Sequence, residues 1–287
     1  MNVRSGKKLN RWHKVLKNER SRVEAFLRER EKYCVSASAR FLSMKERRDH
    51  IWYMPGAKGE ISALLIHSRQ TLFPVFGKNS RIPAPRFLNR FLGKVYIHAL
   101  QGLREDAERL ETLMEDQGYY AAERIEYELM NLDGALKPLT QRAGPASLAL
   151  RPPLPDDEDA LFALQSAYEQ EEVVPVNAVF NPAVTRLNIR TIIEREQVLV
   201  AELNRQVVGK INTSAESFTR YQIGGVYVRP DCRNLGIGSK MTAIFAERLL
   251  AQGKGLSLFV KKRNAAACKV YRKIGFSVTA DYRITYY

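Results

Sequence analysis

The stretch GGVYVRPDCRNLGIGSKM, Gly224 to Met241, carries the strongest local signal in the sequence. An apolar, strand-like run ends at Val228, a proline-containing turn follows, and Gly236 and Gly238 lead into an amphipathic segment. Glycines lack a Cβ and let a ligand approach the main chain. The free amides and the positive dipole end of a helix N-terminus favour phosphate oxygens. The stretch therefore predicts a phosphate-binding junction between a strand and a helix.

Other phosphate-binding motifs fit this stretch less well. Met241 stands where the third glycine of the dinucleotide fingerprint would fall, and no GxxxxGK[ST] precedes a helix. What remains is RxxGxG, in which Arg233, together with Lys240, would add positive charge. For the Gly-x-Gly pair taken alone, an ordinary glycine-containing turn is the alternative interpretation.

The length of the chain predicts two domains, because 287 residues exceed the usual domain size of about 100 to 150. Prolines and glycines cluster in the middle of the chain, and the charge pattern changes there. We therefore expect one domain at residues 1–145 and a second at 146–287. The cluster consists of Pro138, Gly144, Pro145, Pro152, Pro153 and Pro155.

Charge is distributed unevenly along the chain, whose net charge is +15. Residues 1–100 carry 22 basic and 7 acidic side chains, residues 101–200 carry 9 and 19, and the remainder carries 15 and 5. A basic N-terminal region is typical of proteins that contact an anionic partner, such as nucleic acid or membrane headgroups. A solvated charged surface is the alternative explanation.

The composition, 45% hydrophobic and 27% charged, is that of a globular protein, and no apolar run approaches the roughly 18 residues of a membrane span. The segment after Met1 is polar and basic, so we expect no secretory signal and a cytoplasmic location. Cys34, Cys232 and Cys268 lie far apart without a CxxC pair, which predicts free thiols and no metal site. All four histidines lie in the first hundred residues.

Hydrophobic periodicity and turn residues predict alternating strands and helices in both halves, hence an α/β (α+β) class. In the second half, Asn181 and Pro182 suit a helix start, and Asn204-Arg205 suits a hairpin turn. Gly275 suits a helix end. The expected elements there are strand 147–151, helices 156–169 and 182–196, a hairpin 197–215, strand 221–228, helix 239–252, strand 256–260, helix 264–274 and one or two final strands.

The first half is expected to be a mixed α/β domain. Its predicted elements are a basic amphipathic helix 10–32, a hairpin within 50–77, a strand 94–100, a helix 103–118, and a strand or short helix 121–130. The basic helix is interpreted as docking on its own domain, with membrane or nucleic-acid contact as the alternative.

From about Ala146 to Tyr287, the chain resembles the GNAT superfamily of acyl-CoA-dependent N-acyltransferases. VYVRPDCRNLGIGSKM matches that family's fourth strand, [QR]xxGx[GA] loop and following helix. VKKRNAAACKVYRKIGF resembles a second family segment through Asn264, Ala267, Tyr271, Lys273, Gly275 and Phe276. The resemblance implies a GNAT fold with a mixed, splayed central sheet flanked by helices, and acetyl-CoA as the co-substrate.

The resemblance also assigns roles to residues around the cofactor. The backbone of Val226, Tyr227 and Val228 would bind the pantetheine arm where this strand splays from the next, and Asn264 would contact the arm. The loop that begins at Arg233 would hold the pyrophosphate. Its amides are those of Asn234, Leu235, Gly236, Ile237, Gly238 and Ser239.

For catalysis, the resemblance implies direct attack of an amine on the thioester, with Tyr271 protonating the departing thiolate as general acid. A core tyrosine at helical spacing is the alternative for Tyr271. Many family members have a glutamate base 11 residues before the loop's Arg or Gln, but Gln222 stands there and a neutral amide cannot accept the proton. Glu172 is our predicted base. Glu171 and Glu202 are further candidates, and an exposed acidic helix end is the alternative for the 171–172 pair.

Lys94 to Gly118 repeats the strand, turn and helix order of the junction, with the single glycine Gly102 where the loop would be. This suggests a degenerate GNAT-like first half, and an unrelated α/β domain is the alternative. Two functions therefore stay open for the chain. One is an N-acetyltransferase acting on an amine acceptor. The other is a non-catalytic module that senses acyl-CoA or binds nucleic acid or an anionic surface. Neither the acceptor nor the oligomeric state has a signal in the sequence.

Overall fold

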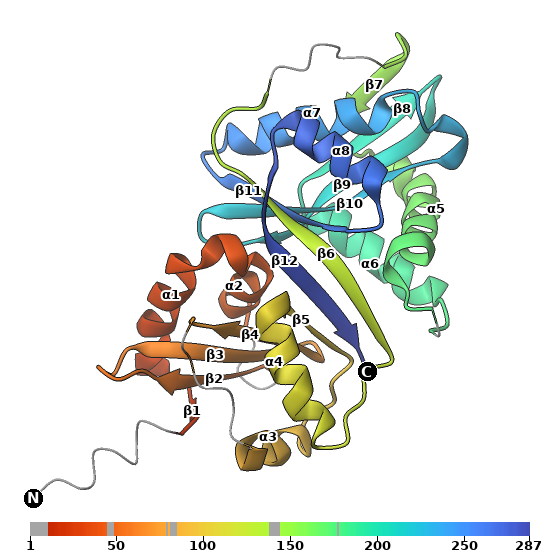
Figure 1. The fold of residues 1–287 in the computed structure, drawn as a ribbon. Helices are drawn as coiled ribbons and strands as arrows, with labels where there is room; N and C mark the ends of the chain where they lie inside the picture. Colours follow the sequence, from red (N-terminus) through yellow and green to blue (C-terminus); the bar gives the residue numbers. More distant parts are fainter. Residues whose placement is uncertain (1–10, 45–48, 79, 81–84, 138–143, 177) are drawn as a thin grey trace, which may run out of the picture. The chain divides into compact units, whose positions relative to one another are not determined.

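A computed structural model describes residues 11–44, 49–78, 80, 85–137, 144–176 and 178–287. The chain forms two compact units, one of residues 1–128 with 280–287 and one of residues 129–279. The sequence placed a boundary at residue 145 instead, within a proline- and glycine-rich stretch of which 138–143 lie outside the described residues. The boundary between the units falls inside strand β6, Glu123–Leu132, a continuous strand that contributes residues to both (Figure 1).

The second unit is built on an antiparallel meander followed by a parallel strand. β7 (Leu148–Arg151), β8 (Val198–Leu203), β9 (Gln206–Glu216) and β10 (Arg220–Val228) pair antiparallel in sequence order. β11, Gly255–Lys261, is parallel to β10, and β6 is its other neighbour. The sheet is therefore mixed, as the sequence predicted.

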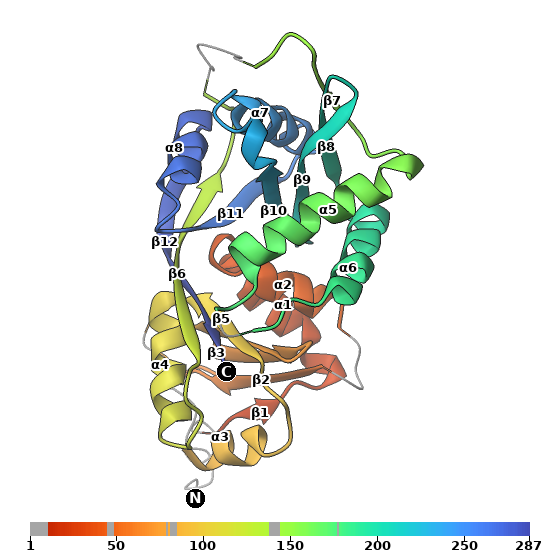
Figure 2. The ribbon, with the colours of Figure 1, turned by 90° about the vertical axis from the view of Figure 1, so that its right-hand side faces the viewer.

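Helices cover both faces of this sheet (Figures 1 and 2). Leu199 and Ala201 of β8 share a core cluster with residues of α7 (Ile237–Leu250) and α8 (Ala265–Ile274). Val200, which points to the opposite face, packs with residues of α5 (Glu158–Tyr168) and α6 (Pro182–Arg195). The period-2 alternation of a strand thus divides the apolar residues between two helical layers.

Local signals in the second half are confirmed residue by residue. The Asn181 side chain accepts hydrogen bonds from the amides of Ala183 and Val184, with Pro182 in the first turn of α6. Asn204 and Arg205 form the β8–β9 turn at φ of 50° and 65°. Gly275 ends α8 at a φ of 125°. The last strand, β12, runs from Ser277 to Tyr286.

The first unit has the same order of strands. β2 (His50–Pro55), β3 (Ile61–Ser68) and β4 (Thr71–Phe76) form an antiparallel meander, and β5, Ala99–Leu103, is parallel to β4. The end of β12 pairs antiparallel with β5. Ala63 and Leu65 of β3 pack with residues of α3 (Pro85–Leu92) and α4 (Arg104–Glu115). α1 (Arg20–Glu29) and α2 (Val35–Leu42) also contact β3.

Three predictions for this unit were wrong in detail. Residues 10–32 do not form one helix. Trp12 is buried and stacks on Phe87, with the ring centroids 5.7 Å apart, and strand β1, His13–Lys14, pairs with β2 before α1 begins. Residues 50–77 hold three strands, since Arg69 and Gln70 take positive φ and make a second tight turn. The predicted strand 94–100 starts only at Ala99.

The internal repeat also has a different register from the one the sequence suggested. Strands β2, β3, β4 and β5 correspond in order to β8, β9, β10 and β11. The counterpart of the junction between β10 and α7 therefore follows β4. The predicted repeat, β5 followed by α4, corresponds instead to β11 followed by α8. Gly102 lies within β5 beside Pro74, whose carbonyl oxygen a Cβ would approach to 3.2 Å. It is a close-packed strand residue rather than part of a loop. In the described ranges, no helix has the length and apolarity of a membrane span.

Candidate active site

Strands β10 and β11 separate part way along their length. Their parallel pairing joins Arg220, Tyr221 and Gln222 to the residues Gly255–Ser257. β10 then continues to Val228 and β11 to Lys261 without further pairing between them in the described structure. The predicted arm-binding residues Val226, Tyr227 and Val228 lie on this separated part of β10, whose edge is the kind that an extended, peptide-like ligand can join as an added strand.

A bulge in β10 marks the same place. Gly224 pairs with Asn212 and Tyr227 with Lys210, so two residues of β10 lie opposite one residue of β9. Gly225 takes a φ of 57°, and a Cβ there would lie 2.1 Å from Asn212 Oδ1 and 2.7 Å from Lys210 Nζ. Only glycine fits this position.

The partner of the bulge is a lysine that sequence reasoning missed. Lys210 is fully buried, and its Nζ donates hydrogen bonds to the Gly225 carbonyl and to Asn212 Oδ1, each at 2.9 Å. Burial lowers the pKa of Lys210 to about 7. The available signal was a lysine between Val208 and Ile211 inside an otherwise apolar predicted strand.

The loop after β10 presents unpaired amides at a helix start. Asn234 and Gly236 take φ of 64° and 77°, and α7 begins at Ile237. The amides of residues 234–239 take part in no hydrogen bond with any described residue, and Lys240 N–H is the first amide bonded back, to the Gly236 carbonyl. A Cβ at Gly238 would make only an ordinary van der Waals contact, 3.7 Å from Val228 Cγ2. The predicted loop residues therefore form one turn of unpaired amides beside the end of β10, an arrangement that favours anions.

Arg233 occupies a different place from the one expected. Its Nη1 and Nη2 donate to Glu171 Oε1 and Oε2 at 3.1 and 2.8 Å, and its Nε donates to the Val228 carbonyl at 3.1 Å. Hydrogen bonding from Arg233 lowers the pKa of Glu171. The guanidinium thus ties the π-helical turn Glu169–Val173 to the end of β10 rather than pointing its donors at a phosphate.

Tyr271 lies buried on α8 with a hydroxyl that makes no hydrogen bond within the described part of the chain. Burial raises its pKa, and the nearby Tyr168, Cys268 and Glu172 raise it further. The phenol is therefore protonated at neutral pH and has a proton to donate.

Glu172 and Asn264 come together near Tyr271. Lys261 Nζ lies 3.1 Å from Glu172 Oε2, and Asn264 Nδ2 donates to Glu172 Oε1 at 3.2 Å. The other end of the Asn264 amide, Oδ1, accepts from the Ala267 N–H and caps α8. Asn264 therefore has a structural role in addition to any contact with a ligand. Glu172 is a partly exposed carboxyl group close enough to Tyr271 to raise the pKa of its hydroxyl.

The remaining candidates for the general base are bound to other side chains of the protein. Gln222 is buried and donates from Nε2 to Ser214 Oγ at 3.0 Å. Glu202 lies 2.6 Å from Arg151, which also holds Asp157. Glu171 is engaged by Arg233. In the described residues, no group of three or more His, Cys, Asp or Glu side chains could hold a metal ion.

Comparisons with known proteins agree with this geometry. Residues 160–276 match the model of the Acetyltransferase (GNAT) family. This segment contains the separated strands, the loop and the helix of Tyr271. Among curated proteins, none matches the chain.

Solved structures resemble nearly the whole chain. A Drosophila protein superposes with a TM-score of 0.67 at 11% identity, covering 96% of this chain and 98% of its own. A GCN5-related N-acetyltransferase from Sphaerobacter thermophilus gives 0.58 at 17%, covering 96% and 94%. A tandem GNAT protein from the clavulanic acid biosynthesis pathway gives 0.56 at 12%, covering 96% and 97%. At these identities the likeness concerns the fold, and it includes both units. Residues 160–276 of this chain thus match the GNAT acetyltransferase family, and the chain as a whole has the fold of two GNAT-like halves.

Proposed function

We propose that this protein transfers an acetyl group from acetyl-CoA to an amine. The observation that carries the proposal is that β10 separates from β11 directly before a loop of six unpaired amides at the start of α7. A peptide-like arm requires an unpaired strand edge, and a diphosphate requires clustered N–H donors. The two requirements are met next to each other, since Gly238 packs beside Val228.

In this proposal, the backbone of Val226, Tyr227 and Val228 binds the arm, and the amides of residues 234–239 bind the diphosphate. Arg233 contributes by holding the Val228 carbonyl and Glu171 in place. The Lys210 contact fixes the bulge carbonyl of Gly225, so the strand edge is preorganised before the ligand arrives.

The reaction requires a neutral amine, a nitrogen–carbon bond that forms at the thioester carbonyl, and a carbon–sulfur bond that breaks. The Tyr271 hydroxyl donates its proton to the departing thiolate, and the proton of the attacking amine leaves to a carboxylate, for which we propose Glu172. A carboxyl group near the phenol is suited to this role, and the proton can then return to Tyr271. No covalent enzyme intermediate is needed.

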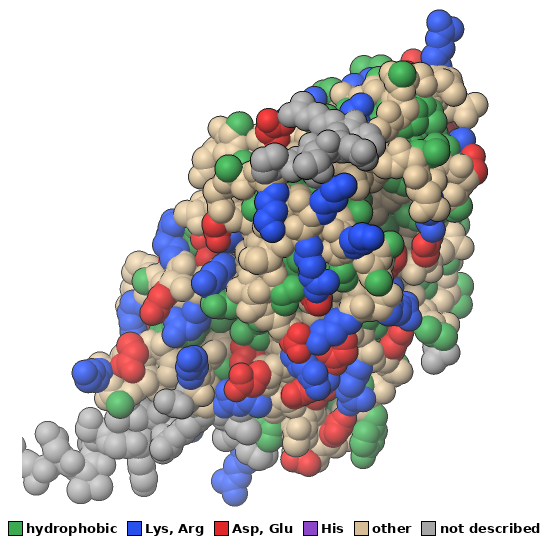
Figure 3. Space-filling view, turned by 45° about the horizontal axis from the view of Figure 1, so that its top comes forward, with side chains coloured by type: hydrophobic (Ala, Val, Ile, Leu, Met, Phe, Trp, Pro, Cys, Tyr) green, Lys and Arg blue, Asp and Glu red, His purple; other side chains and the backbone are tan. Residues whose placement is uncertain are grey.

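One observation favours the second candidate, a non-catalytic acyl-CoA-sensing or anion-binding module. Gln222, a neutral amide, occupies the site of the usual glutamate and is already hydrogen bonded to Ser214. An anionic partner of the basic N-terminal region would fit this role. The face drawn in Figure 3 carries basic and acidic side chains interspersed. Residues 1–10 lie outside the described structure. The anionic partner and the cytoplasmic location remain predictions.

Thiol release from acetyl-CoA, measured over a panel of small amines, amino acids and peptides, tests the proposal. Tyr271→Phe should lower kcat by roughly 100-fold or more while leaving the Kd for CoA unchanged, as expected for loss of a general acid. Glu172→Gln should also lower kcat. Tyr221→Phe is the matched control, because Tyr221 is another buried tyrosine of this unit, bonded to Gln252. CoA binding without turnover of any amine would support the sensing module instead.

A further inference from the structure

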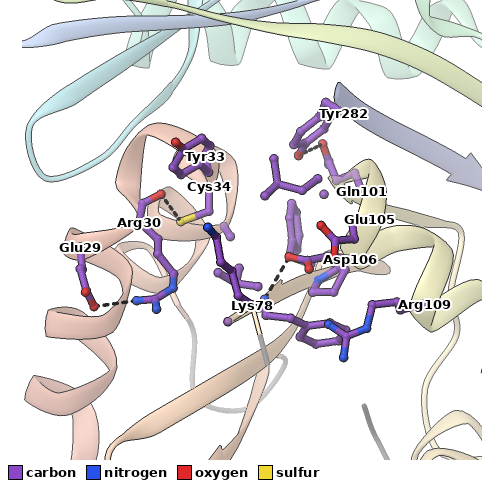
Figure 4. Close-up of a pocket in the computed structure, with 18 residues that line it drawn as sticks. Glu29, Arg30, Tyr33, Cys34, Lys78, Gln101, Glu105, Asp106, Arg109 and Tyr282 are labelled. Carbon is purple, nitrogen blue, oxygen red and sulfur yellow. Dashed lines mark hydrogen bonds and ion pairs between the residues drawn. The ribbon is translucent and has the colours of Figure 1, made fainter. Parts of the chain in front are cut away.

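A cavity in the first unit has no part in the reaction proposed above. Its volume is about 410 Å³, and it opens between β4 and β5 (Figure 4). The end of α1, the start of α2 and the first turn of α4 form its walls, and Tyr282 of β12 and Gln101 of β5 line it as well. Volumes of roughly 300 to 1,000 Å³ are typical of small-molecule sites.

The cavity lies beside a short parallel ladder between β4 and β5, comparable to that between β10 and β11. Their parallel pairing joins Thr71 to Ala99 and Leu72 to Leu100, and the following residues of β4, Phe73 to Phe76, line the cavity. Both units thus have a short parallel ladder at this position, although Gly102 of β5 still packs against Pro74 of β4.

The hydrogen bonding at the end of β4 differs, however, from that at the end of β10. The Phe76 N–H donates to Asp106 Oδ2 at 3.0 Å, and the Gly77 N–H donates to the Ser62 carbonyl at 2.9 Å. The chain itself therefore satisfies two amides at the end of β4. Together with the lack of a Gly-x-Gly sequence after β4, this argues for a ligand other than a diphosphate.

Charges of opposite sign line different sides of the cavity. Glu105 and Asp106 lie at the start of α4, and Figure 4 shows both facing the opening. Asp106 is buried, and burial raises its pKa to about 7, although the hydrogen bond from the Phe76 N–H and the charge of Arg109 act in the opposite direction. Arg109, one turn further along α4, directs its guanidinium to Ser80 instead.

On the other side, Lys78 extends from the end of β4 toward Cys34 and Tyr33 in Figure 4. Lys78 makes no ion pair with any described residue and is exposed, so its ammonium is available to an incoming anion. Between the two sides the lining is apolar, with Ala37, Phe73 and Leu103 among its residues.

We propose that this cavity binds a small zwitterion of the amino-acid type, with its ammonium at Glu105 and Asp106, its carboxylate at Lys78, and an apolar side chain against Phe73. Two separated charges of opposite sign and an apolar body match the arrangement of the lining. A ligand with only one of the charges leaves either the two carboxyl groups or the lysine without a partner of opposite charge.

Titration calorimetry on the full chain tests this with L-phenylalanine and L-leucine as probes. L-phenylalaninamide keeps only the ammonium, and N-acetyl-L-phenylalanine keeps only the carboxylate. The amino acids should bind, and each single-charge analogue should bind at least about tenfold more weakly, since a lost charged hydrogen bond has that effect or more. Absence of binding of both amino acids at millimolar concentration would overturn the proposal, as would an analogue that binds equally well.

Variants locate the site. Asp106→Asn and Lys78→Met should each weaken amino-acid binding by about tenfold or more. Asp116→Asn and Lys94→Met are matched controls, because both residues are exposed and outside the cavity lining, and both variants should bind normally. Gly238→Asp, at the second-unit loop, should also leave amino-acid binding intact. If the controls lose binding as strongly as the cavity variants, or if only Gly238→Asp loses it, the assignment to this cavity is wrong.

Discussion

Replacing Lys210 with methionine should change how the stability of the protein depends on pH. Lys210 is fully buried, and burial lowers its pKa from 10.5 to about 7. Between these values the unfolded chain binds a proton at this residue and the folded chain does not. Through Lys210, the free energy of unfolding therefore rises with pH across this window. Below about pH 7 both states bind the proton, so Lys210 adds no pH dependence there.

The size of the effect follows from the same shift. One proton corresponds to at most about 1.4 kcal/mol per pH unit, so the window of about 3.5 units allows at most about 5 kcal/mol. Lys210→Met removes this dependence. The substitution also leaves the Gly225 carbonyl and Asn212 Oδ1 without their hydrogen-bond donor. This loss lowers the stability of the variant by about 1–3 kcal/mol at every pH. The stability advantage of the wild type over the variant should therefore grow as pH rises.

Urea unfolding of both proteins at several pH values from neutral to mildly alkaline measures this difference. Lys94→Met, which removes an exposed lysine, should run parallel to the wild type throughout. A wild-type advantage over Lys210→Met that stays constant over the whole pH range would refute the reasoning, because Lys210 would then hold its proton equally in both states.

Two further predictions concern individual positions. Gly225→Ala should destabilise the protein by several kcal/mol, because the new Cβ meets Asn212 and Lys210. Gly253→Ala, also at positive φ but in open space, should destabilise it by only about 1 kcal/mol. Equal losses in melting temperature for the two variants would contradict the account of the bulge. Burial raises the pKa of Asp106 from 3.8 to about 7. Between these pH values the folded chain therefore binds one proton more at Asp106 than the unfolded chain does. As pH rises from about 4 to 7, the wild type should lose stability relative to Asp106→Asn. A difference that moves the opposite way in denaturation at these pH values would show that the carboxyl is stabilised as an anion.

The sequence predicted the second unit well because its decisive signals are local. A cap such as Asn181, a turn such as Asn204-Arg205 and the glycines of the 234–239 loop each act within a few residues. The strand separation could be predicted too, but only through the resemblance of two motifs to a family.

Contacts between distant residues could not be predicted in this way. Arg233 pairs with Glu171, 62 positions earlier, and this partner takes the guanidinium away from the phosphate loop. Lys210 reaches Gly225 only because a bulge brings the two together. In the first unit, burial of Trp12 against Phe87 outweighed the helical pattern of residues 10–32.

The central claim is that the amides of residues 234–239 bind the diphosphate of an acyl-CoA. Titration calorimetry with desulfo-CoA on the wild type and on Gly238→Asp tests it most directly. The Cβ of an aspartate would not clash there, and at a helix start its charge is compatible with the fold, since the dipole favours an anion. Its charge would nevertheless oppose a diphosphate at the same amides. The account predicts that the wild type binds and that Gly238→Asp, correctly folded, does not. Equal binding by both, or no binding by the wild type, would contradict it.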